Sequence, residues 1–216
     1  MVGHGVMLEC LADDSVGSVL SIVRGHTGQH HAKLCELVHG DFLDYTALVP
    51  QLSGYDACFF CLGVSAAGMT EAAYERITFG FTLAAAEALV RLNPRMTFIY
   101  VSGAGTDSSE HGRTMWARVK GRTENQLLRL PFAGAYMFRP GLIQPRRGVR
   151  SKTPAYRLLY GLMKPVLPML RWCFPRLVTT TEEVGRAMLI VARRGASKRI
   201  LENRDIVAIA QQSLQP

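Results

Sequence analysis

Apolar and polar positions along this chain fall into blocks that predict strands and helices in alternation. Short apolar or β-branched runs predict strands, whereas longer stretches with apolar positions three to four residues apart predict helices. Strands are predicted at residues 19–23, 34–38, 57–61, 97–101 and 135–138. Helices are predicted at residues 3–11, 45–52, 71–92, 115–130, 181–193 and 206–212.

This alternation predicts an α/β fold, a doubly wound parallel sheet of the Rossmann type in a single domain over residues 1–216. The run 57–61 is apolar throughout, which is typical of a strand covered on both faces. Segment 145–178 departs from the alternation, and we expect it to form a small C-terminal cap on the substrate side of the sheet.

Composition narrows the class of protein. The 216 residues are 48% apolar, enough for one domain with a substantial core, and the net charge of +8 favours an anionic partner. Five cysteines at irregular spacing argue against a disulfide framework, and neither they nor the histidines form a metal-binding pattern. No signal peptide opens the chain and no apolar run reaches the ~20 residues of a membrane span, so we expect a cytoplasmic protein.

The first residues resemble the end of a phosphate-binding turn. Gly3 opens the predicted helix, in the place of the glycine that allows close packing of helix against strand. In a Rossmann unit a strand and a glycine-rich turn come before this helix. The sequence therefore predicts that the first strand is missing, lying upstream of Met1, and that the sheet has a gap beside residues 57–61.

Short motifs follow the predicted strands in an order that identifies a family resemblance. The chain resembles the atypical short-chain dehydrogenases and reductases, in the NAD(P)-binding, epimerase-like group related to the Tat-interacting tumour-suppressor oxidoreductase. The motifs are Ser21-Ile22-Val23-Arg24, Gly40-Asp41-Phe42, Cys61-Leu62-Gly63-Val64, Tyr100-Val101-Ser102-Gly103-Ala104, Lys120-Gly121-Arg122-Thr123-Glu124 and Arg139-Pro140-Gly141.

The resemblance implies a nicotinamide dinucleotide cofactor. Arg24 stands where the family places an arginine on the adenosine 2′-phosphate, which favours NADP(H) over NAD(H) because a guanidinium pairs with phosphate. Asp41 and Phe42 match the adenine-side pair. The other residues implied to bind the cofactor are Gly3, Leu62, Gly63, Lys120 and Pro140.

The catalytic pattern of the family is incomplete here. Ser102 and Lys120 match the serine that orients the substrate and the lysine that holds the nicotinamide ribose. The tyrosine four residues before that lysine is replaced by Trp116, whose indole N–H is no proton donor at neutral pH. A side chain of the loop 107–110 is a candidate substitute; the alternative is that Trp116 packs in a non-catalytic cofactor binder.

The segment between Asn125 and Thr181 is basic, with ten Lys and Arg residues and no Asp or Glu. Aromatic and aliphatic residues lie among these charges, a pattern that suits either a substrate cap or contact with a membrane surface. Three prolines, Pro165, Pro168 and Pro175, interrupt any single amphipathic helix. No nucleic-acid-binding motif accompanies the charge.

The sequence thus predicts an NADP(H)-binding oxidoreductase or epimerase-like enzyme with a small-molecule substrate and no metal. The alternatives are a non-catalytic NADP(H)-binding regulator or assembly protein, and a peripheral membrane protein that acts through its basic cap.

Overall fold

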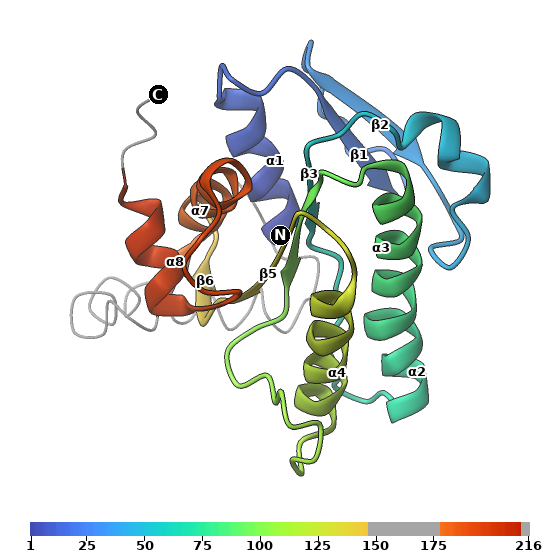
Figure 1. Cartoon of the computed structure of the whole chain (residues 1–216), viewed down its shortest axis with the longest axis vertical. Coiled ribbons are helices and arrows are strands. Elements are labelled where there is room, and N and C mark those ends of the chain that lie inside the picture. Colours follow the sequence, from blue (N-terminus) through green and yellow to red (C-terminus); the bar gives the residue numbers. More distant parts are fainter. Residues whose placement is uncertain (147–177, 213–216) are drawn as a thin grey trace.

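The computed structural model describes residues 1–146 and 178–212 as an α/β fold (Figure 1). Its strands are β1 (Val19–Val23), β2 (Leu34–Val38), β3 (Ala57–Phe60), β4 (Thr97–Val101), β5 (Gly134–Arg139), β6 (Leu142–Gln144), β7 (Val178–Thr180) and β8 (Ile200–Glu202). Its helices are α1 (Val2–Ala12), α2 (Glu71–Glu75), α3 (Phe81–Leu92), α4 (Met115–Arg129), α7 (Thr181–Arg194) and α8 (Asn203–Ala210). A 3₁₀ helix covers Thr46–Gln51, and a π-helical turn at Arg76–Gly80 joins α2 to α3.

Every strand pair in the described residues is parallel. The main sheet has the order β3-β4-β5-β8, β1 pairs with β2, and β6 pairs with β7. Parallel pairing requires crossover connections, and helices supply most of them, such as α2 and α3 between β3 and β4. This is the parallel α/β fold of the Rossmann type that the hydrophobic pattern predicts.

The sheet is divided beside β3, as the sequence predicts. No hydrogen-bonded strand of the described residues joins β1 to β3, so β1-β2 forms a separate two-stranded sheet. Helix α1 contacts both β1 and β3, and it approaches the end of β3 closely. A Cβ atom at Gly3 would lie 3.2 Å from the Cβ of Cys61, so glycine permits this close approach.

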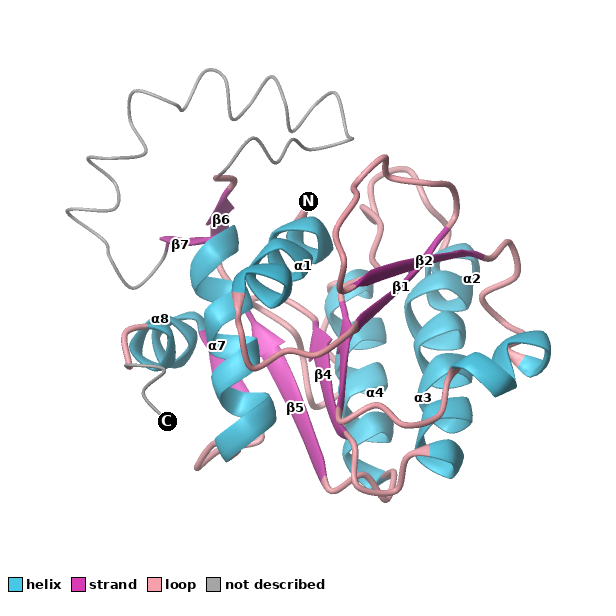
Figure 2. Ribbon diagram, turned by 90° about the horizontal axis from the view of Figure 1, so that it is seen from above, coloured by secondary structure: helices cyan, strands magenta, loops and turns pink. Residues whose placement is uncertain are grey.

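Apolar side chains cover both faces of the main sheet. One core cluster centres on Phe60, Phe98 and Tyr100, packed against α3 and the 3₁₀ helix. The other centres on Ile99 and Phe138, packed against α1, α7 and α8. Figure 2 shows the two layers, with α7 and α8 on one side of β4 and β5 and with α3 and α4 on the other.

The strongly periodic elements lie where the sequence predicts them, and the shortest elements were missed. Strands β1, β2 and β4 have the predicted bounds, and residues 71–92 are helical throughout, with the π turn inside. Strands β6, β7 and β8 have three residues each and were not predicted. The predicted cap over 145–178 lies, apart from its ends, outside the described residues.

Candidate cofactor and active site

The residues singled out from the sequence follow the carboxyl ends of five parallel strands. Arg24 follows β1, Asp41 lies shortly after β2, Gly63 after β3, Ser102 directly after β4, and Pro140 directly after β5. In open α/β sheets, ligands bind outside the carboxyl ends of the strands. Gly63, Ser102 and Pro140 thus follow neighbouring strands of the main sheet, whereas Arg24 and Asp41 follow the strands of the separate β1-β2 sheet.

The adenosine-side candidates differ in how much of each side chain is accessible. Arg24 is exposed, and no carboxylate within the described residues forms an ion pair with it. Asp41 is exposed, and its Oδ1 accepts a hydrogen bond of 3.0 Å from the backbone N–H of Leu43. Phe42 is 5% exposed and stacks on Phe81 with 5.8 Å between ring centroids. The Phe42 ring therefore belongs to the core, and only its backbone is left to meet an adenine.

Leu62 and Gly63 form the turn after β3. Leu62 is half-buried against the core, whereas Gly63 is exposed and a Cβ built on it meets nothing within 4 Å. Neighbouring protein atoms thus do not require glycine at this position, and the space above the turn is open to a ligand. Gly3, in the first turn of α1, lies beside this turn through its contact with Cys61.

Ser102 and Lys120 lie together at the end of β4. The Lys120 Nζ donates a hydrogen bond to the backbone carbonyl of Ser102, which joins α4 to the end of β4. Burial lowers the pKa of the Lys120 ammonium below its ordinary value, and the carboxylate of Glu124 opposes this effect. Ser102 itself is 4% exposed.

A buried ion pair that the sequence did not predict lies behind Ser102. Glu124, on α4, is 0% exposed and accepts hydrogen bonds from Ser102 Oγ at 2.5 Å and from Arg139 Nη2 at 2.5 Å. Burial alone would lower the pKa of Arg139, but the hydrogen bonds and charge of Glu124 outweigh it and raise the pKa. The signal in the sequence was the presence of Glu124 four residues after Lys120, one helical turn along the same face.

Trp116 lies on α4, four residues before Lys120, where the short-chain dehydrogenases that the sequence resembles have a tyrosine. Its ring centroid lies 6.0 Å from the Lys120 Nζ, and a Cβ on Gly105 would lie 3.3 Å from the ring. The indole thus packs between the ammonium group and the loop that follows β4. It supports Lys120 by a cation–π contact but supplies no acid group.

The polar side chains of the loop 107–110 have structural partners. Asp107 accepts hydrogen bonds from the backbone N–H groups of Ser109 and Gly112. Ser108 Oγ accepts a hydrogen bond of 2.6 Å from Arg139, and Glu110 accepts one of 2.7 Å from Asn125. Ser109 Oγ donates a hydrogen bond of 2.6 Å to Asp107 Oδ1. These contacts shape the loop and tie it to α4, and all four polar side chains of the loop take part in them.

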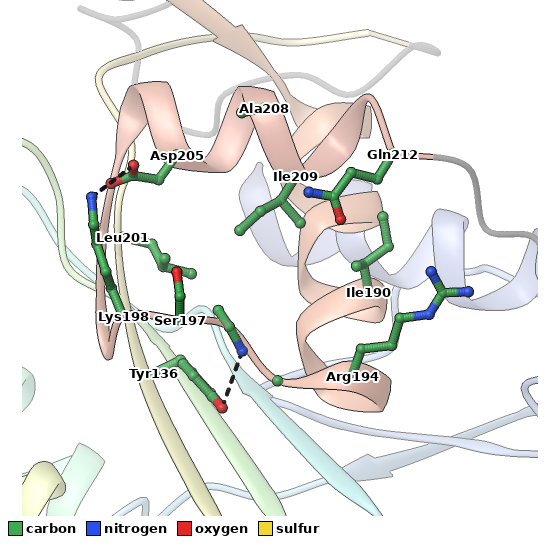
Figure 3. A pocket seen from close by; sticks show the side chains of 12 residues that line it. Tyr136, Ile190, Arg194, Ser197, Lys198, Leu201, Asp205, Ala208, Ile209 and Gln212 are labelled. Carbon is green, nitrogen blue, oxygen red and sulfur yellow. Dashed lines mark hydrogen bonds and ion pairs between the residues drawn. The ribbon is translucent and has the colours of Figure 1, made fainter.

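Two cavities are lined by none of these candidate residues. One of about 510 Å³ lies between α7, α8 and β5, and its lining includes Tyr136, Ile190 and Leu201 (Figure 3). Its segment 195–198 precedes β8, so this cavity lies toward the amino end of that strand. The other, of about 660 Å³, lies in the loop between β1 and β2 and is lined by His26, His30 and His31.

The described part of the chain gives little support for a metal site or for a reactive thiol. It contains no group of three or more His, Cys, Asp or Glu side chains placed to hold a metal ion. Burial raises the pKa of the Cys61 thiol to about 12 and also raises the pKa of Cys58, so both are protonated near neutral pH. They behave as small core side chains.

Comparison with known sequences gives a relative over part of the chain. No family model matches the chain. It is 33% identical over 117 residues to Protein FMP52-2, mitochondrial, of Scheffersomyces stipitis. The match covers 53% of this chain and 48% of the relative, so the chain spans about half the length of the curated relative it matches. In residues 1–146 and 178–212 no helix is long and apolar enough to cross a membrane, and the predicted cytoplasmic location stays a prediction.

Solved structures share the fold at low sequence identity. The Bordetella bronchiseptica enzyme WbmF, solved with NAD+, aligns over 96% of this chain and 73% of its own at a TM-score of 0.64 and 13% identity. The Helicobacter pylori ADP-L-glycero-D-manno-heptose-6-epimerase aligns over 98% and 78%, with TM-score 0.63 and 14% identity. The Thermotoga maritima UDP-glucose 4-epimerase aligns over 88% and 70%, with TM-score 0.61 and 12% identity. These likenesses show the fold.

Proposed function

We propose that this protein binds NADP(H) along the carboxyl ends of β1 to β5 and acts as an oxidoreductase or epimerase-like enzyme on a small molecule. The observation that carries the proposal is the Lys120 ammonium held on the carbonyl of Ser102, at the ligand-binding edge of a Rossmann-type sheet. Solved proteins of this fold include one with NAD+ bound and two epimerases, which supports the same class of cofactor and chemistry.

In this proposal each end of the cofactor has its own partners. Arg24 meets the adenosine 2′-phosphate, Asp41 the adenine side, and Lys120 the nicotinamide ribose. The open turn at Gly63 accommodates the dinucleotide between them. Bound cofactor would supply or accept a hydride, and the protein would position the substrate and move the proton.

The hydroxyl of Ser102 points inward, which affects the choice of substrates to test. It donates to Glu124 Oε1 at 2.5 Å and to the Phe138 carbonyl at 3.1 Å, both of which accept hydrogen bonds. With its hydroxyl held by these buried acceptors, Ser102 by itself indicates no particular substrate group. Alcohols with NADP+ and carbonyl compounds with NADPH should therefore both be screened.

Cofactor choice is tested at Arg24. The protein is expected to bind NADPH more tightly than NADH in a fluorescence titration, and Arg24→Ala should remove most of that difference. The expected loss is about 1–3 kcal/mol, the range of a charge-assisted hydrogen bond. Arg95→Ala is the matched control, because Arg95 is also exposed but precedes β4, at the amino end of that strand. Equal affinity of the parent protein for both cofactors would contradict the proposed 2′-phosphate contact.

A non-catalytic NADP(H)-binding regulator is the second candidate, and Trp116 favours it. If only the proton donor is lacking, Trp116→Tyr should raise turnover of alcohols or carbonyl compounds by roughly 10²- to 10⁴-fold, the usual contribution of a general acid or base. Trp116→Phe is the control, since it matches the ring size of tyrosine without its hydroxyl. Rates that stay equally low in both variants, with NADPH still bound, would favour the regulator over the enzyme.

Contact with a membrane surface through the basic segment stays a prediction from the sequence, because nearly all of that segment lies outside the described residues.

A further inference from the structure

Glu124 is a charged group with no role in the proposed cofactor site, yet it is completely buried directly behind that site. Arg139 holds both of its carboxylate oxygens, with Nε at 3.0 Å from Oε1 and Nη2 at 2.5 Å from Oε2. The same Oε1 accepts the hydrogen bond from Ser102 Oγ. A carboxylate fixed by a fork of this kind has little freedom to rotate.

Ser102 connects this carboxylate to Lys120. Its hydroxyl group is bound to Glu124 on the inner side, and its backbone carbonyl accepts the hydrogen bond from the Lys120 Nζ on the outer side. Glu124 and Lys120 also lie one turn apart on α4, so the three groups close a ring of contacts between helix and strand end.

We propose that Glu124 is the positioning residue of this site: clamped by Arg139, it fixes Ser102 so that the serine hydroxyl points into the core and the serine carbonyl holds the Lys120 ammonium. The inference rests on the proposed function, because it concerns the group assigned there to the nicotinamide ribose. Arg139 in turn reaches Ser108 at 2.6 Å and Glu202 at 3.2 Å, so the clamp is itself attached to the loop after β4 and to β8.

The charge of Glu124 has a second effect on Lys120. Burial disfavours the ammonium form, and the Glu124 carboxylate is the charge that opposes this among the described residues. Removing the carboxylate charge should therefore lower the pKa of Lys120 further. A residue that only filled space behind Ser102 would leave this pKa unchanged.

Trace acetylation measures this directly in the protein without cofactor. The chain has five lysines, so the acetylation of Lys120 by acetic anhydride can be followed by peptide mass spectrometry as a function of pH. In Glu124→Gln, which keeps the size of the side chain, the midpoint for Lys120 should fall by about half a pH unit or more relative to the parent protein.

The matched control is Glu75→Gln. Glu75 also pairs with an arginine of α4, Arg122, at 2.5 Å, but this pair lies on the surface. The Lys120 midpoint should not change in this variant. An unchanged midpoint in Glu124→Gln, in a protein whose thermal midpoint shows that it is folded, would overturn the proposal.

Ser102→Ala provides a second test if Glu124→Gln does not fold. It removes the hydrogen bond between Ser102 and Glu124 but keeps both charges. Because the carbonyl is then held less firmly, Lys120 should be acetylated faster than in the parent protein below its midpoint. The expected increase is roughly twofold to tenfold, the equivalent of one ordinary hydrogen bond; an unchanged rate would mean that Glu124 does not act through Ser102.

Acetylation in the presence of NADPH distinguishes a failure of this inference from a failure of the proposed function. If NADPH binds as proposed, it should protect Lys120 from acetylation and leave Lys33 unaffected. Absence of protection alone would count against the cofactor site, whereas the midpoint shift in Glu124→Gln together with faster acetylation in Ser102→Ala, both in the cofactor-free protein, would still support Glu124 as the positioning residue.

Discussion

Arg139→Met is expected to destabilise the protein by about 3–5 kcal/mol, because it leaves the Glu124 carboxylate buried without its positive partner. Glu124 is 0% exposed, and the Arg139 side chain is 10% exposed, so water cannot replace the lost guanidinium without rearrangement of the core. Urea denaturation measures the change as a lower midpoint at constant slope.

The control for this variant is Arg122→Met, which breaks the ion pair between Arg122 and Glu75. That pair has the same N–O separation of 2.5 Å, but its side chains are 53% and 35% exposed. Its loss should cost about 1 kcal/mol or less, since solvent screens exposed pairs. The double variant Arg139→Met/Glu124→Gln should recover part of the loss, because the unpaired charge is gone. Equal effects of Arg139→Met and Arg122→Met would show that burial does not strengthen the dependence on Arg139.

Gly121→Ala is expected to be the second strongly destabilising change, by about 3 kcal/mol or more, at the upper end of the cost of overpacking. A Cβ atom on Gly121 would lie 1.7 Å from the backbone carbonyl oxygen of Asp107, an overlap that no side-chain rotation relieves. The loop crosses α4 at this point, where the N–H of Asp107 donates a hydrogen bond of 3.1 Å to the carbonyl of Ala117. Moving the loop away would also break that bond.

Whether Gly121→Ala destabilises or stabilises the protein distinguishes the effect of the tertiary contact from the effect of helix propensity. In an exposed helix, replacing glycine with alanine stabilises by up to about 1 kcal/mol. Gly17→Ala is the control outside helices, since a Cβ there meets nothing within 4 Å and the change should be neutral or slightly stabilising. Thermal and urea midpoints of Gly121→Ala at or above those of the parent protein would contradict the observed crossing of loop and helix.

Much of the fold could be predicted because its signals are local. The run Thr97–Val101 is apolar and contains β-branched residues, so it is predicted to be a buried strand whichever strands lie beside it. Residues 71–92 have helical periodicity throughout. The short strands β6, β7 and β8 have too few residues to show a period. Their pairing with segments far along the chain gives them their structure.

The candidate site was predicted in part for the same reason. Ser102, Arg24 and Gly63 are located by strand ends, which the hydrophobic pattern marks. The role of Glu124 could not be predicted, because it depends on Arg139, a residue of β5 that becomes its neighbour only when α4 packs on the sheet. Likewise, the crowding at Gly121 exists only because the loop after β4 lies across the helix.

By itself, the sequence determined the alternation of strands and helices, the parallel sheet that follows from it, and the placing of polar residues at strand ends. These are consequences of burial and of side-chain periodicity along a short stretch of chain. Only the tertiary structure decided that Phe42 is a core residue, that Ser102 directs its hydroxyl inward, and that Arg139 neutralises Glu124. The physical reason is that hydrogen bonds and ion pairs depend on distances of about 3 Å between groups far apart in sequence, which local patterns do not specify.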